Sequence, residues 1–272
     1  SEAAAKVFKG AHCPSNAPVK KYNISAINVE VALNQWGDYY PGYMYVLDED
    51  IKRVRAEEEK NAKAREDEND PGAVSTGLQG DAIQPLAIRG NQGDCVRVHF
   101  TNSVEDEDAG FQVNGSSMII SSSGLPASAV SPGAIVKSGE SQDFEWHIPI
   151  DEQEGSHLIQ SRSGRDPSAL GLIGAFIVEP VGSTYLDPWD AKPLKNGWEA
   201  IIANDEDRDF REFVLFYHEV GDESFRPLNR FGEMIPQRDP LTDAYRPSAR
   251  AMNYRSEPFG INNLAVQDKM FH

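Results

Sequence analysis

Residues 155–180, GSHLIQSRSGRDPSALGLIGAFIVEP, decide the fold class. The stretch opens with a glycine and a short apolar run, and it closes with Gly171-Leu172-Ile173-Gly174 and an apolar run that ends at Pro180. Along the rest of the chain, strand-like runs outnumber helical ones, and 17 Pro and 22 Gly supply turns between them. This pattern favours an all-β protein.

The order of glycines and apolar residues in 155–180 resembles the closing hairpin of a cupredoxin domain from the multicopper oxidase family. That family has a His-x-His motif where this chain has Gln160-Ser161-Arg162. Neither an amide nor a guanidinium can replace a neutral imidazole as a copper ligand. The resemblance therefore implies a cupredoxin-like Greek-key β-sandwich in which this part of the chain does not hold the metal.

An earlier stretch, 82–102 (AIQPLAIRGNQGDCVRVHFTN), predicts two strands joined by a tight turn at Gly93-Asp94. It resembles the cupredoxin pattern too. In the family's copper-bearing domains the next strand carries His-x-His-Gly, and the register places Gln112 and Asn114 there, before Gly115. Two ligand motifs are thus lost in register. The resemblance implies no catalytic, cofactor-binding or metal-binding residue on this chain, with Gln112, Asn114, Gln160 and Arg162 at the lost copper-ligand positions.

The residues before 82 predict two strands and a helix. Apolar residues alternate from Ile27 to Leu33, as in a strand with one buried face, and 39–47 (YYPGYMYVL) follows as an aromatic-rich run through a Pro41-Gly42 turn. Residues 48–67 predict a helix with Asp48 as N-cap, which packs loosely or stays in solvent. This opening resembles the large bacterial multicopper oxidases associated with manganese oxidation.

The C-terminal part predicts a second domain. Residues 209–220 (DFREFVLFYHEV) predict a new buried strand, and 251–259 (AMNYRSEPF) resembles an Ile-Asn-Tyr-Arg-Ser-Glu-Pro-Phe motif of the same bacterial group. In that group the sequence continues beyond this point, so His272 is kept as an open metal-ligand candidate. The expected organisation is an N-terminal arm (1–20), a copper-free cupredoxin-like domain with a helical insertion near 48–69 (21–180), a connector (181–208) and the first, incomplete part of a second cupredoxin domain (209–272).

Charge and hydropathy limit the partners. The formal net charge of −17 repels phosphate backbones, which argues against nucleic-acid binding. The same charge fits either attraction of metal cations or simple solubility. The sequence contains no run of 18 or more apolar residues, so it predicts no transmembrane span. The first ten residues fit a mature N-terminus left after signal-peptide removal or the edge of a fragment, and we expect a secreted, periplasmic or cell-surface protein.

The chain is poor in soft metal ligands. Cys13 and Cys95 are the only cysteines, and the sequence allows either a disulfide between them or two independent thiols. The six histidines are scattered and form neither His-x-His nor His-Cys-His. A complete copper site of this family needs such clusters.

Two functions follow from these observations. The first is the N-terminal, non-copper-binding structural part of a secreted multicopper oxidase. The resemblance implies that copper domains outside this chain would couple one-electron oxidation of a metal ion such as Mn(II), or of another reductant, to O2 reduction. Copper is then expected in the complete protein and not on this chain, and the partners are the remaining cupredoxin domains of the same protein or a companion chain. The alternative is a non-enzymatic binding or assembly subunit on a degenerate cupredoxin scaffold.

Overall fold

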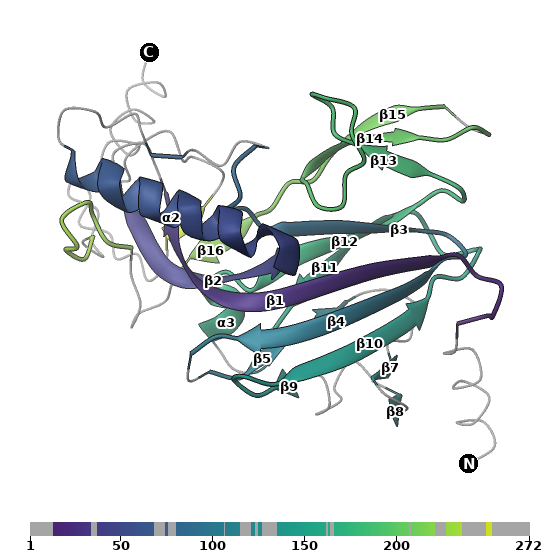
Figure 1. Cartoon of the computed structure of the whole chain (residues 1–272), viewed down its shortest axis with the longest axis horizontal. Coiled ribbons are helices and arrows are strands. Elements are labelled where there is room, and N and C mark those ends of the chain that lie inside the picture. The colour runs from purple at the N-terminus through teal and green to yellow at the C-terminus, as the bar shows by residue number, and fades with distance from the viewer. Residues whose placement is uncertain are drawn as a thin grey trace, which may run out of the picture.

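The structure is a computed structural model, and it describes residues 13–33, 37–67, 74–75, 80–105, 107–114, 121–122, 125–126, 135–161, 163, 166–206, 208–220, 227–235 and 249–251. Two sheets face each other as the layers of a sandwich (Figure 1). The first sheet has the strand order β2-β1-β4-β10-β7-β8, and the second has the order β3-β12-β11-β6.

The strands of the first sheet are β1 (Val19–Ala32), β2 (Tyr39–Leu47), β4 (Cys95–Ser103), β10 (Ser141–His147), β7 (Ser121–Ser122) and β8 (Leu125–Pro126). Those of the second sheet are β3 (Leu86–Asn91), β12 (Ile173–Glu179), β11 (Gly155–Gln160) and β6 (Gln112–Val113). Two short pairs lie outside the sandwich sheets, namely β5 (Ala109–Gly110) with β9 (Ile135–Val136) and β16 (His218–Val220) with β17 (Ala249–Ala251).

The connections cross repeatedly between the two sheets. After β1 and β2 in the first sheet the chain moves to β3, returns to β4, and later passes from β10 to the β11–β12 hairpin. Two neighbouring pairs are parallel, β1 with β4 and β3 with β12, while the other pairs of long strands are antiparallel. This is a Greek-key arrangement, and the predicted all-β, cupredoxin-like sandwich is confirmed.

Aromatic side chains fill the space between the sheets. Trp146 of β10 packs edge-on against Phe176 of β12, with ring centroids 5.2 Å apart, and neither side chain reaches solvent. Phe111 contacts Tyr45 of β2 and Phe144 of β10, two strands that are not neighbours in the first sheet. Burial of these large aromatic rings between the two layers stabilises the sandwich.

The predicted turn at Gly93-Asp94 is confirmed. Gly93 has φ +86°, and the Asp94 backbone N–H donates to the Asn91 carbonyl at 2.9 Å. The Asp94 carboxylate in turn accepts from the Asn91 backbone N–H at 2.9 Å. Glycine supplies the left-handed conformation and aspartate satisfies a donor within the turn, which is why this pair of residue types joins β3 to β4.

The helix covers the outer face of β1 and β2. It consists of a 3-10 turn η1 (Asp48–Asp50) followed by α2 (Ile51–Glu66), and Figure 1 shows it lying across these strands. Val54 is fully buried against a second apolar cluster that includes Ile27 and Val29. Of the two predicted alternatives, a helix that stays in solvent was wrong, and a helix that packs through few residues is what the structure has, with Val54, Asn61 and Ala64 buried. The two clusters take different halves of β1, since Tyr22, Ile24 and Ala26 belong to the core between the sheets and Ile27, Val29 and Val31 belong to the cluster that contains Val54.

Asp48 does not act as the N-cap of α2. Its carboxylate accepts a hydrogen bond from the Ser25 hydroxyl of β1 at 2.7 Å, which fastens the start of η1 to the sheet. The N-cap residue of α2 is Asp50, whose side chain makes no capping hydrogen bond. A tertiary hydrogen bond has replaced the local cap that the sequence predicted.

The predicted turn at Pro41-Gly42 was also wrong, because both residues lie within strand β2. β2 is the edge strand of its sheet, where a proline can lack a ladder donor without cost. At Gly42 a Cβ atom would lie 2.3 Å from the Leu170 carbonyl oxygen. The glycine thus allows a close approach of two backbones and does not reverse the chain.

A three-stranded antiparallel sheet stands beyond the β3 side of the sandwich (Figure 1). It consists of β13 (Thr184–Leu186), β14 (Glu199–Ala203) and β15 (Phe210–Phe213), so two of its strands lie in the segment 181–208 that was predicted as a connector. The prediction of a buried strand over 209–220 was wrong. β15 is an edge strand, and its Phe210 and Phe213 are 40% and 54% exposed. The division into domains stays a prediction.

Candidate functional site

Two of the positions at which the family's copper ligands are lost face each other in the second sheet. Gln112 of β6 and Gln160 of β11 are directly opposed Cα partners, and the next pair along is Val113 with Ile159. Ile159 is fully buried in the core and Val113 packs against that core. Because side chains alternate along a strand, Gln112 and Gln160 project from the opposite, outer face of the sheet. The fold thus brings together two motif positions that are far apart in the sequence.

The chemistry of this pair does not fit copper. Gln112 is 9% exposed, and its amide oxygen Oε1 is buried without a hydrogen-bond partner among the described residues. Asn114 follows β6 and is tied to β11 by a backbone hydrogen bond to the Leu158 carbonyl, 2.9 Å long. Uncharged amides offer no imidazole nitrogen or thiolate. The other two positions, Arg162 and His272, lie outside the described residues.

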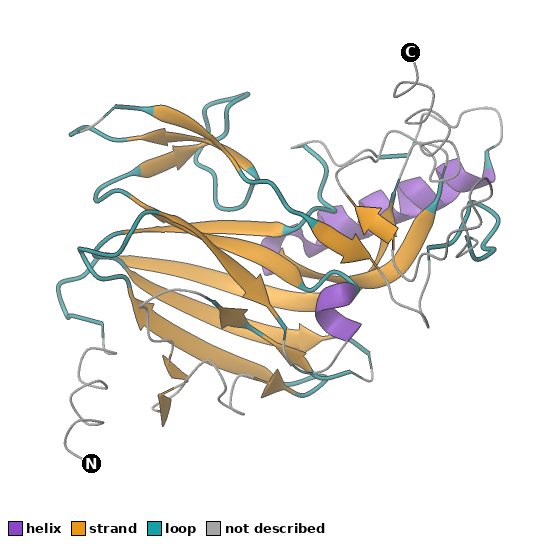
Figure 2. Ribbon diagram, turned by 180° about the vertical axis from the view of Figure 1, so that it is seen from behind, coloured by secondary structure: helices purple, strands orange, loops and turns teal. Residues whose placement is uncertain are grey.

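A hollow of about 550 Å³ opens on the same outer face, next to Gln160. Strands β11 and β12, helix α3 (Asp166–Ala169) and the extended segment 214–217 line it. Figure 2 shows α3 at one end of this sheet, seen from behind. None of the lining residues that the structure describes is charged, although a quarter of the whole chain is Asp, Glu, Lys or Arg. Depletion of charge is typical of the core of a protein contact.

Apolar side chains at the rim of this hollow reach solvent. Leu158 of β11 is 46% exposed, and Leu215 and Tyr217 of the following segment are 73% and 74% exposed. Val214 and Phe216, at the alternate positions, pack against the outer face of β3 and β12. Sequence reasoning missed this surface. The signal was present, because an apolar run with no alternation, as in 213–217, indicates contacts on both sides of an extended segment.

The histidines do not form a metal centre among the residues that the structure describes. His99 of β4 is exposed, and its Nδ1 lies 2.7 Å from an oxygen of Asp143 on β10. His147 ends β10 and His157 lies in β11, so both occupy strands, as does the backbone of His218 in β16. The side chain of His218 and the whole of His12 lie outside the described part.

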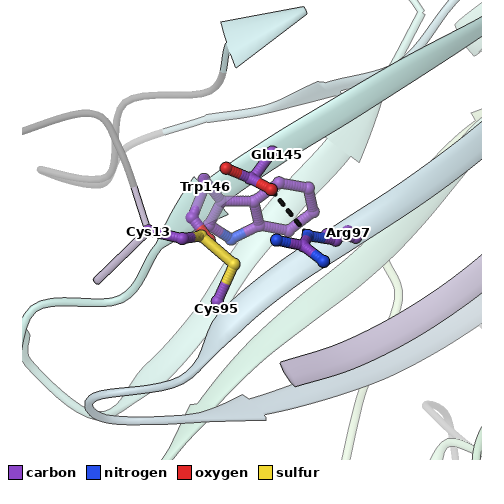
Figure 3. The surroundings of a disulfide bond; sticks show 5 residues. All are labelled: Cys13, Cys95, Arg97, Glu145 and Trp146. Carbon is purple, nitrogen blue, oxygen red and sulfur yellow. Dashed lines mark hydrogen bonds and ion pairs between the residues drawn. A yellow bond between two sulfur atoms is a disulfide. The ribbon is translucent and has the colours of Figure 1, made fainter. Parts of the chain in front are cut away.

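One group of three potential ligands occurs in the described ranges, namely Cys13, Cys95 and Glu145. Figure 3 shows that the two sulfur atoms are joined to each other and that Glu145 forms an ion pair with Arg97. A disulfide offers no thiolate, and the carboxylate already has a cationic partner. This group is a covalent cross-link between the N-terminal arm and β4, which resolves the alternative that the sequence left open.

No protein-family model matches the chain, and no curated protein matches it. Among solved structures, the chain is similar to a multicopper oxidase from Pseudomonas thermotolerans, with 20% identity, a TM-score of 0.37, and coverage of 62% of this chain and 31% of that chain.

Two further similar structures carry related names. A multicopper oxidase from Campylobacter jejuni, described as a metallo-oxidase, has 15% identity and a TM-score of 0.39, with coverage of 64% of this chain and 29% of that one. A laccase from Botrytis aclada has 15% identity and a TM-score of 0.37, with coverage of 65% and 25%. The chain spans less than two thirds of the length of each of these proteins. The fold assignment stands on the strand order and register given above.

In the described part of the chain, no helix has the length and hydrophobicity of a membrane-spanning segment.

Proposed function

We propose that this chain is the N-terminal structural part of an exported multicopper oxidase, built on a cupredoxin-like sandwich that does not itself hold copper. The observation that supports it is the pairing of Gln112 with Gln160 across β6 and β11. The register that would set two ligand motifs side by side is kept, but both positions carry amides. A metal ion would find no nitrogen or thiolate donor there.

On this proposal, electron transfer belongs to copper domains outside this chain. Those domains would oxidise Mn(II) or another reductant by single electrons and reduce O2, and the residues described here would take no part in that step. The role of this chain would be to pack against the remaining cupredoxin domains, in the same protein or in a companion chain. The hollow beside Gln160, whose described lining residues carry no charge, supports a protein contact on this face. The Cys13–Cys95 disulfide supports an exported, oxidising location.

A second candidate function is a non-enzymatic assembly subunit. The exposed apolar side chains of Leu158, Leu215 and Tyr217 favour it, since a contiguous apolar surface of this kind marks a contact site whether or not the partner contains copper. The first function requires that the polypeptide continue into copper-binding domains, and the second does not. The denatured intact mass of the native preparation separates them: a mass well above 30.1 kDa, with histidine-rich peptides after His272, supports the oxidase part. A mass of 30.1 kDa with no companion chain supports the assembly subunit.

Copper binding tests the structural role directly. After incubation with Cu(II) in the presence of a weak competing chelator and removal of excess metal, we expect the purified chain to retain far less than one copper per molecule. Gln112→Ala and Gln160→Ala should leave that value unchanged, because an amide contributes no copper-binding donor here. Elemental analysis by mass spectrometry gives the ratio.

The matched control is Gln153→Ala, which removes an exposed glutamine between β10 and β11. A stoichiometric copper content that falls on Gln160→Ala but not on Gln153→Ala would contradict the structural role.

A further inference from the structure

A buried group of charged side chains lies where the three-stranded sheet meets the second sheet of the sandwich. Arg89 of β3 and Glu179 of β12 belong to the sandwich, and Glu212 of β15 belongs to the three-stranded sheet. The side chains of Arg89, Glu179 and Glu212 are 1%, 3% and 18% exposed. Charged groups are rarely buried to this extent unless they are paired.

The guanidinium of Arg89 ties the two sheets together. Its Nε and Nη2 atoms donate to Glu212 Oε1 at 2.9 and 2.5 Å, and Nη1 donates to the Gly197 carbonyl at 2.9 Å. Both acceptors lie beyond the sandwich, in the segment that leads into β14 and in β15. The remaining contact is within the sandwich, where Arg89 Nε lies 3.4 Å from Glu179 Oε1.

One cation therefore serves two carboxyl groups. If both carboxyl groups were ionised, the buried group would carry an excess negative charge, and Glu179 Oε1 accepts no hydrogen bond from a residue that the structure describes. Burial, above all, and the neighbouring Glu212 raise the pKa of Glu179 to about 8, although Arg89 acts to lower it. At neutral pH the proton on Glu179 brings the group to electrical balance.

The other titratable groups that face Glu179 reinforce this state. Glu154, which precedes β11, adds negative charge and also raises the pKa of Glu179. Tyr185 of β13 donates its hydroxyl proton to Asn91 Oδ1 at 2.5 Å, and burial raises the pKa of this phenol, so Tyr185 stays neutral. The one cation near the carboxyl group remains Arg89, within the part of the chain that the structure describes.

We propose that Glu179, Arg89 and Glu212 form a proton-dependent latch: with Glu179 protonated, the latch fastens the three-stranded sheet to the sandwich, and the fastening weakens as the pH rises. The extended segment 214–217 follows β15 directly and forms one wall of the hollow beside Gln160. Release of β15 would therefore widen access to that face of the sandwich. The latch operates whether or not the chain is part of an oxidase.

The direction of the pH effect follows from proton linkage. The carboxyl group has a pKa of about 8 in the docked state and an ordinary value of 4.5 when exposed, so the docked state binds more protons between these two pH values. The stabilisation of docking is complete below the lower value and is lost as the pH rises to the upper one. Over this interval the ratio of docked to released molecules falls by at most about tenfold per pH unit.

Hydrogen–deuterium exchange of the whole chain tests the latch. After correction for the intrinsic pH dependence of exchange, we expect the opening of peptides covering 199–213 to increase steeply between pH 5.5 and 8. In Glu179→Gln the neutral amide replaces the protonated carboxyl group, and the opening should become independent of pH. Glu206→Gln is the matched control, because it removes an exposed carboxylate from the β14–β15 connection and should keep the pH dependence of the unaltered chain.

An opening that does not depend on pH in the unaltered chain, or the same pH dependence in Glu179→Gln, would overturn the latch. If Glu179→Gln does not fold, carboxyl-carbon magnetic resonance of the unaltered chain decides. A glutamate that titrates near pH 8 in the unaltered chain, and that is also present in the spectrum of Glu206→Gln, supports the latch. Titration of every glutamate near its ordinary value overturns it.

Discussion

Removal of the disulfide by Cys13→Ser together with Cys95→Ala is expected to lower the free energy of unfolding by about 4.5 kcal/mol at 25 °C. The bridge joins residues separated by 82 positions, and a cross-link of that span strongly restricts the unfolded chain. Cys95 is fully buried at the start of β4, so alanine avoids placing an unpaired hydroxyl in the core. Denaturant unfolding of the two proteins under non-reducing conditions measures the difference.

A reductant supplies the control for this prediction. The unaltered chain in excess reductant should approach the stability of the double variant, and the double variant should not respond to the reductant. A loss below about 1 kcal/mol would show that the arm contributes little to the constraint on the unfolded chain. Since the bridge also holds Cys13 beside β10 and β4 (Figure 3), proteolysis near Cys13 should become faster in the double variant.

The cupredoxin-like fold could be predicted because its signals are local. The Gly93-Asp94 turn needs one left-handed residue and one side-chain acceptor, and the sequence supplies both in order. Pro41-Gly42 carries an equally strong turn signal but lies in a strand. There the deciding contact is between Gly42 and the Leu170 carbonyl. Leu170 is distant in the sequence, so no residue near position 42 indicates this contact.

For the candidate site too, some features could be predicted from the sequence and others could not. The family pattern placed Gln112 and Gln160 at ligand positions, and the register of β6 with β11 set them opposite each other. The apolar run 213–217 indicates that this segment makes contacts, but the position of the hollow beside Gln160 could not be predicted, because one of its walls is a segment that follows a separate sheet. The Arg89–Glu179–Glu212 group is also invisible in the sequence, since its members come from three strands of two sheets and none belongs to a recognisable pattern.

The second large effect on stability is expected from truncation of Trp146, which joins the two layers. We expect Trp146→Ala to lower the free energy of unfolding by about 3–5 kcal/mol. Trp146 is fully buried and contacts Phe176 of the opposite sheet, so alanine leaves a cavity that the facing strands cannot fill without moving. Denaturant unfolding followed by circular dichroism measures this loss without relying on tryptophan fluorescence.

Trp146→Phe separates packing from hydrogen bonding. The indole Nε1 of Trp146 is buried and has no hydrogen-bond partner in the described ranges, so phenylalanine loses ring volume but leaves no group newly unsatisfied. We therefore expect a loss clearly smaller than that of Trp146→Ala. Trp189→Ala is the control, since Trp189 is 77% exposed and its truncation should change stability by no more than about 0.5 kcal/mol. If Trp146→Phe lowered the free energy of unfolding as much as Trp146→Ala, the stability would come from a hydrogen bond of the indole N–H. The packing of the ring against Phe176 would then not be its source.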